Sequence, residues 1–263
     1  MGSISNYLEL ELLDHVFKVG AYTAATNIAV SLHTADPTDA GTGAECANAN
    51  NYARVVCNVW NAAGGTRVTA NTSAITFPQA SGSWGTVTHW ALWDSATYGA
   101  GNCLAHGSFT ASKVIVSGNI PTIAAGDLDI TVTTGAISNY LASALLNHFL
   151  KTAAYTVPTN ICAALSTADP TDDGSGIAEP VGNNYSRTTN NTWDIAAAGA
   201  TANTGAMTTA TASGSWGTIA YTALFDAATV GNMLWYGTIS PSQAVGANDY
   251  MEWAAGSFDV TLD

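Results

Sequence analysis

Seven residues, Ala80–Thr86, recur letter for letter as Ala212–Thr218. An identity of this length, with a tryptophan at its centre, indicates that the chain contains an internal duplication. The register holds far from this stretch, because Ile4–Leu8 recurs 133 residues later as Ile137–Leu141. Towards the end of the repeat the offset falls to 130, and the drift occurs where Gly, Ala and Ser cluster, as expected of loops.

The length of the repeat sets the domain organisation. Solenoid and propeller repeats run about 20 to 50 residues, so a period of about 130 is a whole domain. The sequence therefore predicts two homologous domains, residues 1–134 and 135–263, with Thr133–Gly135 as the only candidate joint. A domain of this size buries about two thirds of its unfolded surface, so neither half needs a metal or a disulfide to fold.

Charge is scarce and one-sided. Charged residues make up 10% of the chain, against roughly 25% in an ordinary soluble domain. The formal net charge is -13 and there are only six Lys and Arg residues. Because nucleic acids and anionic membranes are bound through Lys and Arg, neither is expected as a partner. No apolar run is long enough for a membrane span, and no signal peptide is expected.

The first element of each repeat is predicted to be a helix. Ser5 and Ser138 are suitable N-caps, and apolar residues follow at helical spacing. These apolar residues are Ile4, Tyr7, Leu8, Leu12, Leu13, Val16 and Phe17 in the first copy, and Ile137, Tyr140, Leu141, Leu145, Leu146 and Phe149 in the second. Lys18 and Lys151 are expected in the last turn, where a cation suits the helix dipole.

His15 and His148 occupy the same place in the two predicted helices. A histidine present in both copies is a candidate ligand. No His, Asp or Cys follows at i+4, however, and this favours a structural histidine of the core or of the C-terminal turn.

After the helix, the hydrophobic period changes to two. Thr26–His33 and Asn160–Leu165 alternate as half-buried strands do. Further candidate strands of the first copy are Ile75–Phe77, Thr86–Asp94, Asn102–Phe109 and Asp127–Val132. Turn signals between such strands at spacings of about eight to twelve residues are typical of an antiparallel sandwich. The predicted fold is mainly β, with two tandem homologous antiparallel β-sandwich domains, each with an N-terminal α-helix.

An acidic turn follows the first predicted strand of each repeat. Ala35–Gly43 contains Asp-Pro, a second Asp and two glycines, and its copy carries Asp169, Asp172 and Asp173. Pro fixes φ, Asp binds its own backbone and Gly supplies positive φ, so these residues predict a turn. Calcium is the alternative ligand of the carboxylates, although their spacing is not that of a calcium-binding hand and Asp173 is matched by Ala40.

Each cysteine occurs in one copy only. Cys46, Cys57 and Cys103 are matched by Glu179, Asn190 and Met233, and Cys162 is matched by Ala29. A structural disulfide or metal site of the domain would be present in both copies. Free apolar cysteines are therefore expected, with a Cys46–Cys57 bridge as the alternative.

No catalytic constellation is found. Ser81–Gly85 lacks the Gly-x-Ser-x-Gly spacing of a nucleophile elbow. A triad would have to use Ser83, Asp94 and either His89 or His106, but the second copy has tyrosine at both histidine positions. Motifs for nucleotides, dinucleotides and zinc are also missing. We therefore predict no enzyme activity, no cofactor and no metal site, and a glycine turn that places its tryptophan on the sheet edge.

Several short motifs occur in a fixed order along the first repeat. They are Ser5–Leu8, Leu12–Phe17, Ala35–Asp39, Gly82–His89 and Asp94–Thr97. In this order they resemble a small virion-protein domain of tailed bacteriophages, of the kind labelled tail-fibre-like or head-decoration protein. The resemblance covers essentially all of both halves and implies a structural, non-enzymatic component of the virus particle. The chain departs from the usual single domain by carrying two in tandem.

Two functions are compatible with this resemblance. The leading hypothesis is a capsid decoration or cement subunit that stabilises the head, because an acidic, low-charge β-protein buries neutral surface against its neighbours. The alternative is a tail or tail-fibre component involved in host-surface attachment. Saccharide stacking would then suit Trp90, Trp93, Trp235 and Tyr236, although core packing explains most tryptophans of a sandwich.

A secreted carbohydrate-binding module or hydrolase is a third possibility. The expected partners are other copies of the chain, with a trimer as a hypothesis, and either the major capsid protein or tail proteins. The expected location is the virion, assembled in the cytoplasm of the bacterial host.

Overall fold

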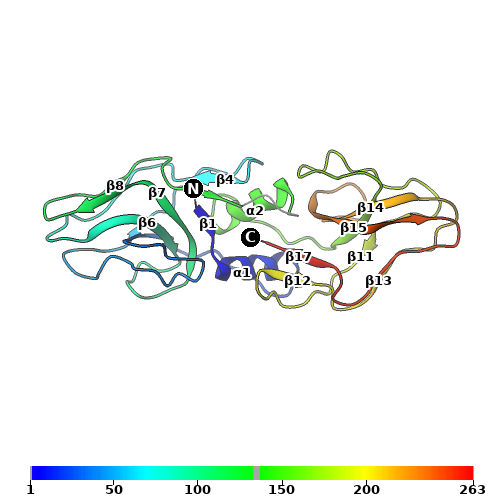
Figure 1. Cartoon of the computed structure of the whole chain (residues 1–263), viewed down its shortest axis with the longest axis horizontal. Coiled ribbons are helices and arrows are strands. Elements are labelled where there is room, and N and C mark those ends of the chain that lie inside the picture. The colour runs from blue at the N-terminus through cyan, green and yellow to red at the C-terminus, as the bar shows by residue number, and fades with distance from the viewer. Residues whose placement is uncertain (1, 133–136, 263) are drawn as a thin grey trace.

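The computed structural model describes residues 2–132 and 137–262, and Figure 1 shows an elongated molecule. Residues 2–132 form lobe 1 and residues 137–262 form lobe 2; the two lobes extend in opposite directions from a waist that contains both helices (Figure 1). Two tandem, mainly antiparallel β domains with a helix near the start of each are thereby confirmed. The predicted joint Thr133–Gly135 lies outside the described residues, so the boundary at residue 134 stays a prediction.

The two lobes repeat the same order of elements. The described elements of lobe 1 are β1 (Gly2–Ile4), α1 (Asn6–Val16), β2 (Ala29–His33), β3 (Val55–Val56), β4 (Val68–Ala70), β5 (Ile75–Thr76), β6 (Gly85–Trp93), β7 (Cys103–Ile115), β8 (Thr122–Ile123) and β9 (Asp129–Thr131). Those of lobe 2 are α2 (Asn139–Phe149), β10 (Cys162–Ser166), β11 (Thr188–Thr189), β12 (Ala200–Ala202), β13 (Met207–Thr208), β14 (Gly217–Phe225), β15 (Met233–Val245), β16 (Glu252–Trp253) and β17 (Asp259–Thr261).

Each lobe is built around a long antiparallel hairpin, β6–β7 in lobe 1 and β14–β15 in lobe 2. The sheet of lobe 1 has the order β3-β2-β6-β7-β1-β9-β4, and β11-β10-β14-β15 form the matching sheet of lobe 2. The ribbons β5–β8 and β13–β16 lie apart from these sheets. The hairpins leave the waist beside the helix N-caps, where Ser5 N donates to Leu104 O and Ser138 N donates to Leu234 O, and they reach the outer ends of the molecule (Figure 1).

The first long strand of each lobe is more buried than its alternating sequence predicts. Every residue of β2 and β10 is buried. In lobe 1 the acidic turn lies against the end of this strand, because His33 Nδ1 is 3.0 Å from Gly43 O. The prediction of a half-buried strand was therefore wrong, since small and polar side chains such as Ser31 are enclosed as well.

The predicted N-caps are confirmed. Ser5 Oγ accepts a hydrogen bond from Leu8 N at 3.3 Å, and Ser138 Oγ accepts one from Leu141 N at 3.1 Å. The prediction for the two lysines was wrong. The helices end at Val16 and Phe149, and Lys18 and Lys151 follow the C-cap residues with φ of 67° and 63°. A positive φ turns the chain away from the helix axis, so neither lysine lies in the last turn.

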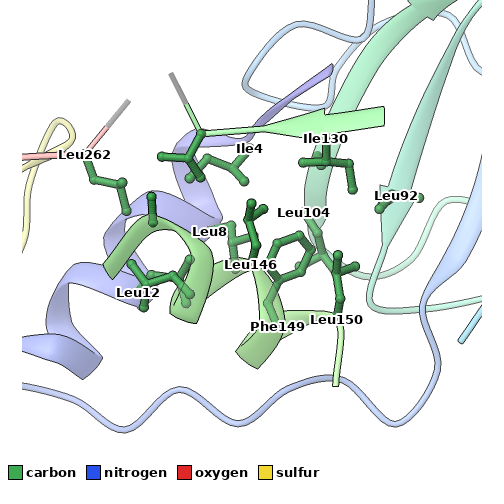
Figure 2. Close-up of a cluster of buried hydrophobic side chains, with 14 of the residues drawn as sticks. Ile4, Leu8, Leu12, Leu92, Leu104, Ile130, Leu146, Phe149, Leu150 and Leu262 are labelled. Carbon is green, nitrogen blue, oxygen red and sulfur yellow. The ribbon is translucent and has the colours of Figure 1, made fainter. Parts of the chain in front are cut away.

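The two helices meet in a single hydrophobic core. Figure 2 shows Leu8 and Leu12 of α1 beside Leu146 and Phe149 of α2, and all of these side chains are almost fully buried. Each fully buried side chain of this size contributes about 1.5–3 kcal/mol. Each helix also bridges the two lobes, because α1 contacts β12 as well as β7 of its own lobe, and α2 contacts β4 as well as β15 of its own lobe. The predicted helix at the start of each domain is thus present, and the structure adds that each helix contacts both lobes.

Candidate functional site

The waist is the site where the two repeats are joined, and its polar contacts occur in matched pairs. Asp14 Oδ1 in α1 accepts a hydrogen bond from Ala196 N of lobe 2 at 2.7 Å. Asn147 Oδ1, at the same position of α2, accepts one from Ala63 N of lobe 1 at 2.7 Å. Each helix therefore satisfies a backbone amide of the opposite lobe, and the two halves are related by approximate twofold symmetry.

The lysines that follow the helices form a second matched pair. Lys18 Nζ donates to Thr159 O of lobe 2 at 2.7 Å, and Lys151 Nζ donates to Thr26 O of lobe 1 at 2.8 Å. Each ammonium group thus connects the two lobes. The sequence had predicted an interaction with the helix dipole instead.

His15 and His148 stack on each other at the centre of the waist. Their ring centroids are 4.7 Å apart and their planes differ by 6°. Tyr22 N donates to His15 Nδ1 at 3.2 Å and Tyr155 N donates to His148 Nδ1 at 3.1 Å, which places the proton of each neutral ring on Nε2. Burial and the neighbouring His148 lower the pKa of His15. The rings therefore act as structural residues of the helix C-terminus, as the sequence favoured.

One charged contact among the described residues of the waist is present on one side only. Arg67, at the start of β4, donates to Asn139 Oδ1 and lies 3.4 Å from Asp172 Oδ2. The matching position before β12 is Gly199. The two sides of the waist thus differ by one charged link, which fixes the N-terminus of α2 against lobe 1.

A buried arginine in each lobe holds the loop between the long hairpin strands. Arg54 pairs with Glu45 at 2.8 Å and also donates to Ser95 O and Ala100 O, while its guanidinium lies 4.0 Å from the centre of the Trp93 ring.

The second lobe repeats this contact through Arg187. It pairs with Glu179 at 2.6 Å and lies 3.6 Å from the centre of the Phe225 ring. Because Glu45 and Glu179 play the same role, the match of Cys46 with Glu179 was wrong by one residue. The sequence matched the two arginines but gave no signal of their partners, since Ile177 shifts the register between the acidic turn and the glutamate.

The repeated tryptophans lie in glycine turns at the outer ends, as predicted. Trp84 Nε1 donates to Asn50 O and Trp216 Nε1 donates to Asn183 O, both at 2.9 Å. Each tryptophan is followed by a glycine with φ near 90°, Gly85 at 89° in lobe 1 and its copy at 86° in lobe 2. The turns therefore pin the neighbouring loops to the sheets.

The serine, histidines and aspartate considered as a catalytic triad make hydrogen bonds with other residues. Ser83 Oγ accepts from the amide of the next glycine, and His89 Nδ1 lies 2.8 Å from Thr88 Oγ1. The carboxylate of Asp94 accepts from Asn102, and His106 pairs with Asp39 at 2.8 Å. The structure does not bring these residues together as nucleophile, base and acid.

A serine–histidine pair that the sequence did not single out lies inside lobe 1. Ser31 Oγ is 2.7 Å from His33 Nε2 and accepts from Trp93 Nε1 at 2.7 Å. Ser31 and His33 are both fully buried, and burial lowers the pKa of His33 to about 4. Lobe 2 has Ala164 and Ser166 at these positions. The pair therefore lies inside lobe 1, with neither side chain exposed at the surface.

The acidic turns are closed by their own hydrogen bonds. Asp36 Oδ1 and Asp169 Oδ1 each accept from the backbone amide two residues on, at 2.9 Å. Asp172 accepts from Tyr236 Oη at 2.6 Å. Within the described residues, no group of three or more His, Cys, Asp or Glu side chains could hold a metal ion.

The cysteines and the large aromatic residues belong to the interior. All four cysteines are free and buried. Trp90, Trp93 and Trp235 are buried and Tyr236 is half-buried, so these aromatic side chains do not form an exposed platform for saccharides. The exposed tyrosines are Tyr98, Tyr140 and Tyr250.

The fold and its contacts define a duplicated β-protein whose repeated residues hold its own parts together. The family model of podophage GP4 fiber I protein gp80 matches residues 3–131 and again residues 136–261. The chain therefore belongs to this phage fibre family and carries its domain twice. No protein with a curated description matches the chain, and no helix in the described residues is long and apolar enough to cross a membrane.

Proposed function

We propose that this chain is a non-enzymatic structural component of a bacteriophage fibre, in which the waist holds two fibre domains in line. The observation that carries the proposal is the double match to a phage fibre family, on residues 3–131 and 136–261. The bridging helices and paired contacts of the waist support it, because a shared core keeps two domains in a fixed relation. Its partners are further fibre proteins and other copies of the chain, and its place is the virion.

The family match favours the fibre component over the capsid decoration subunit. Immunogold labelling of intact phage particles with an antibody against the chain distinguishes the two. Gold on the fibres is the expected result. Gold spread evenly over the heads would overturn the proposal and support the decoration subunit.

Attachment to the host surface is a separate question, because the tryptophans that suited saccharide stacking are buried. We therefore expect the purified chain to hold fibre parts together and not to bind host cells. Sedimentation of the labelled chain with host cells measures this, and saturable binding that competes with phage adsorption would assign an attachment role instead.

A further inference from the structure

The outer end of lobe 1 contains an apolar cavity of about 150 Å³. It lies between β7 and the β5–β8 ribbon. Its apolar lining includes Leu32, Phe77, Val87, Phe109, Ile115 and Ile123. Lys113 and Asp127 are the charged residues of its lining, and both are exposed.

β7 carries a bulge beside this cavity, and β15 of lobe 2 carries the same bulge. Val87 pairs with Lys113 and His89 pairs with Ser108, so the four residues 109–112 of β7 lie opposite Thr88 alone. Such an insertion bends the strand away from its partner. Phe109 is carried on the bulge and forms one wall of the cavity.

Lobe 2 covers the same walls with its own side chains. The counterparts of Leu32, Val87 and Ile115 are Leu165, Ile219 and Val245, and they form a packed cluster. Trp253, which replaces Ile123, and Ile239, which replaces Phe109, pack against this cluster. These walls therefore accommodate an aromatic ring in lobe 2. Lobe 1 has the smaller Ile123 at the position of Trp253, while its Phe77 is larger than the matching Thr209.

Lys113 is the free cation of the described chain. The other five Lys and Arg side chains all have partners: Lys18 and Lys151 bind carbonyls across the waist, and Arg54, Arg67 and Arg187 bind carboxylates. Lys113 makes no hydrogen bond or ion pair with any described residue and is matched by Gln243 in lobe 2. Its neighbours Val114, Val116 and Ile120 are exposed.

The outer end of lobe 2 carries an exposed aromatic ring between acidic residues. Tyr250 is 51% exposed and has no hydrogen bond or ring contact with the described residues. Asp249 and Glu252 flank it and are also exposed. The counterparts in lobe 1 are Asn119, Ile120 and Thr122, which carry neither an aromatic ring nor a charge.

We propose that copies of this chain associate end to end, with Tyr250 of one copy entering the lobe 1 cavity of the next. A cavity of about this volume lined by Leu, Ile and Phe binds a benzene ring. Copies with a net charge of -13 repel each other, so a contact between them is favoured where an acidic tip meets the free cation. Asp249 and Glu252 would face Lys113 in this contact.

The contact joins two different surfaces, so it does not close on itself as a symmetric dimer does. Repetition of such a heterologous contact extends a linear assembly unless the rotation between copies closes a ring. The inference goes beyond the assignment to a fibre and does not depend on it. If gold labelling placed the chain elsewhere on the particle while end-to-end association held, only the proposed function would fail.

Sedimentation equilibrium and small-angle X-ray scattering of the whole chain test the proposal. We expect association that rises with concentration and lengthens the particle without widening it. Tyr250→Ala removes the aromatic ring from the outer end of lobe 2, and Ile123→Trp fills the cavity. Each is expected to weaken association about tenfold or more, as for a central aromatic anchor. Tyr140→Ala removes an exposed tyrosine of α2, away from both outer ends, and is the control that should leave association unchanged.

Exchanging the charges of Lys113 and Glu252 distinguishes loss of a specific contact from loss of folding. Lys113→Glu and Glu252→Lys should each weaken association, because each places like charges at the contact. An equimolar mixture of the two variants should restore association, because the residue at position 113 of one variant then faces an opposite charge at position 252 of the other. Gln243→Glu, the matched site in lobe 2, is the control. A chain that stays monomeric at every concentration, a particle that widens instead of lengthening, or a mixture that fails to recover would overturn the proposal.

Discussion

His33 is fully buried in lobe 1, where burial lowers its pKa to about 4 from an ordinary value of 6.5. Below pH 6.5 the unfolded chain takes up a proton that the folded chain does not, so stability is complete above this pH and falls as the pH falls. Between pH 7 and pH 5 we expect this residue to cost about 2 kcal/mol of unfolding free energy. Urea unfolding at the two pH values measures the loss.

Lobe 2 supplies the control for this prediction. The triple variant Ser31→Ala, His33→Ser and Trp93→Phe gives lobe 1 the side chains that lobe 2 has at these positions, Ala164, Ser166 and Phe225. It should lose this part of the pH dependence and keep the smaller part that comes from His15, whose pKa is also lowered. An unchanged pH dependence would show that His33 is not the group responsible.

Gly85 tests the turn that follows the repeated tryptophan. Its φ is 89°, and an added Cβ would lie 3.2 Å from Thr34 Cγ2. Gly85→Ala should therefore destabilise the chain by about 1–3 kcal/mol through backbone strain. Gly64→Ala, where an added Cβ meets nothing within 4 Å, should stay within about 0.5 kcal/mol of the wild type. Equal midpoints of urea unfolding for the two variants would contradict this account.

At the scale of elements, the contact of each helix with the opposite lobe includes a side-chain acceptor on that helix. Asp14→Ala would leave Ala196 N without its partner, and we expect a loss of about 1–3 kcal/mol. Asp14→Asn should be nearly neutral, because Asn147 makes the same contact in the other helix through its amide oxygen. Urea unfolding of both variants measures this, and an equal loss in both would mean that the charge of Asp14 matters and not its acceptor.

The sequence predicted those elements that carry a periodic pattern. Both helices, their serine caps and the four strands Ile75–Phe77, Thr86–Asp94, Asn102–Phe109 and Asp127–Val132 were placed within a few residues, apart from the outer end of β7. β7 continues to Ile115, but residues 110–113 of this end are exposed and small or polar, a composition that is typical of a loop. The short strands β1, β3, β4 and β8 were missed, because two or three residues are too few to show a period.

The waist and the lobe 1 cavity could not be predicted from the sequence. Helical spacing shows that Leu8 and Leu12 are buried but not that Leu146 covers them, because a pattern of hydrophobic residues does not name its partner. Likewise, Lys113 and Tyr250 become informative only after the structure shows which charges are paired and which rings are exposed. A comparison of the two copies could have singled out both residues from the sequence, since Lys113 is matched by Gln243 and Tyr250 by Ile120.

At the scale of the whole molecule, the shared core makes each lobe depend on the other. The apolar face of α1 is covered in part by β12 of lobe 2, and that of α2 by β4 of lobe 1. A lobe produced alone would expose the side of its helix that the other lobe covers, together with the stacking face of its histidine.

We therefore expect residues 1–132 and 137–263, produced as separate chains, to be less stable alone than when they are mixed. The isolated lobes should melt at a lower temperature or pair with copies of themselves, because the waist is nearly symmetric and His15 can stack on a second His15. An equimolar mixture should form a one-to-one complex with a higher melting temperature, since the mixed pair restores both contacts of the native waist, Asp14 with Ala196 and Asn147 with Ala63. Light scattering after gel filtration gives the stoichiometry and circular dichroism gives the melting temperature. Two lobes that melt as the whole chain does and remain separate on mixing would show that the waist does not stabilise them.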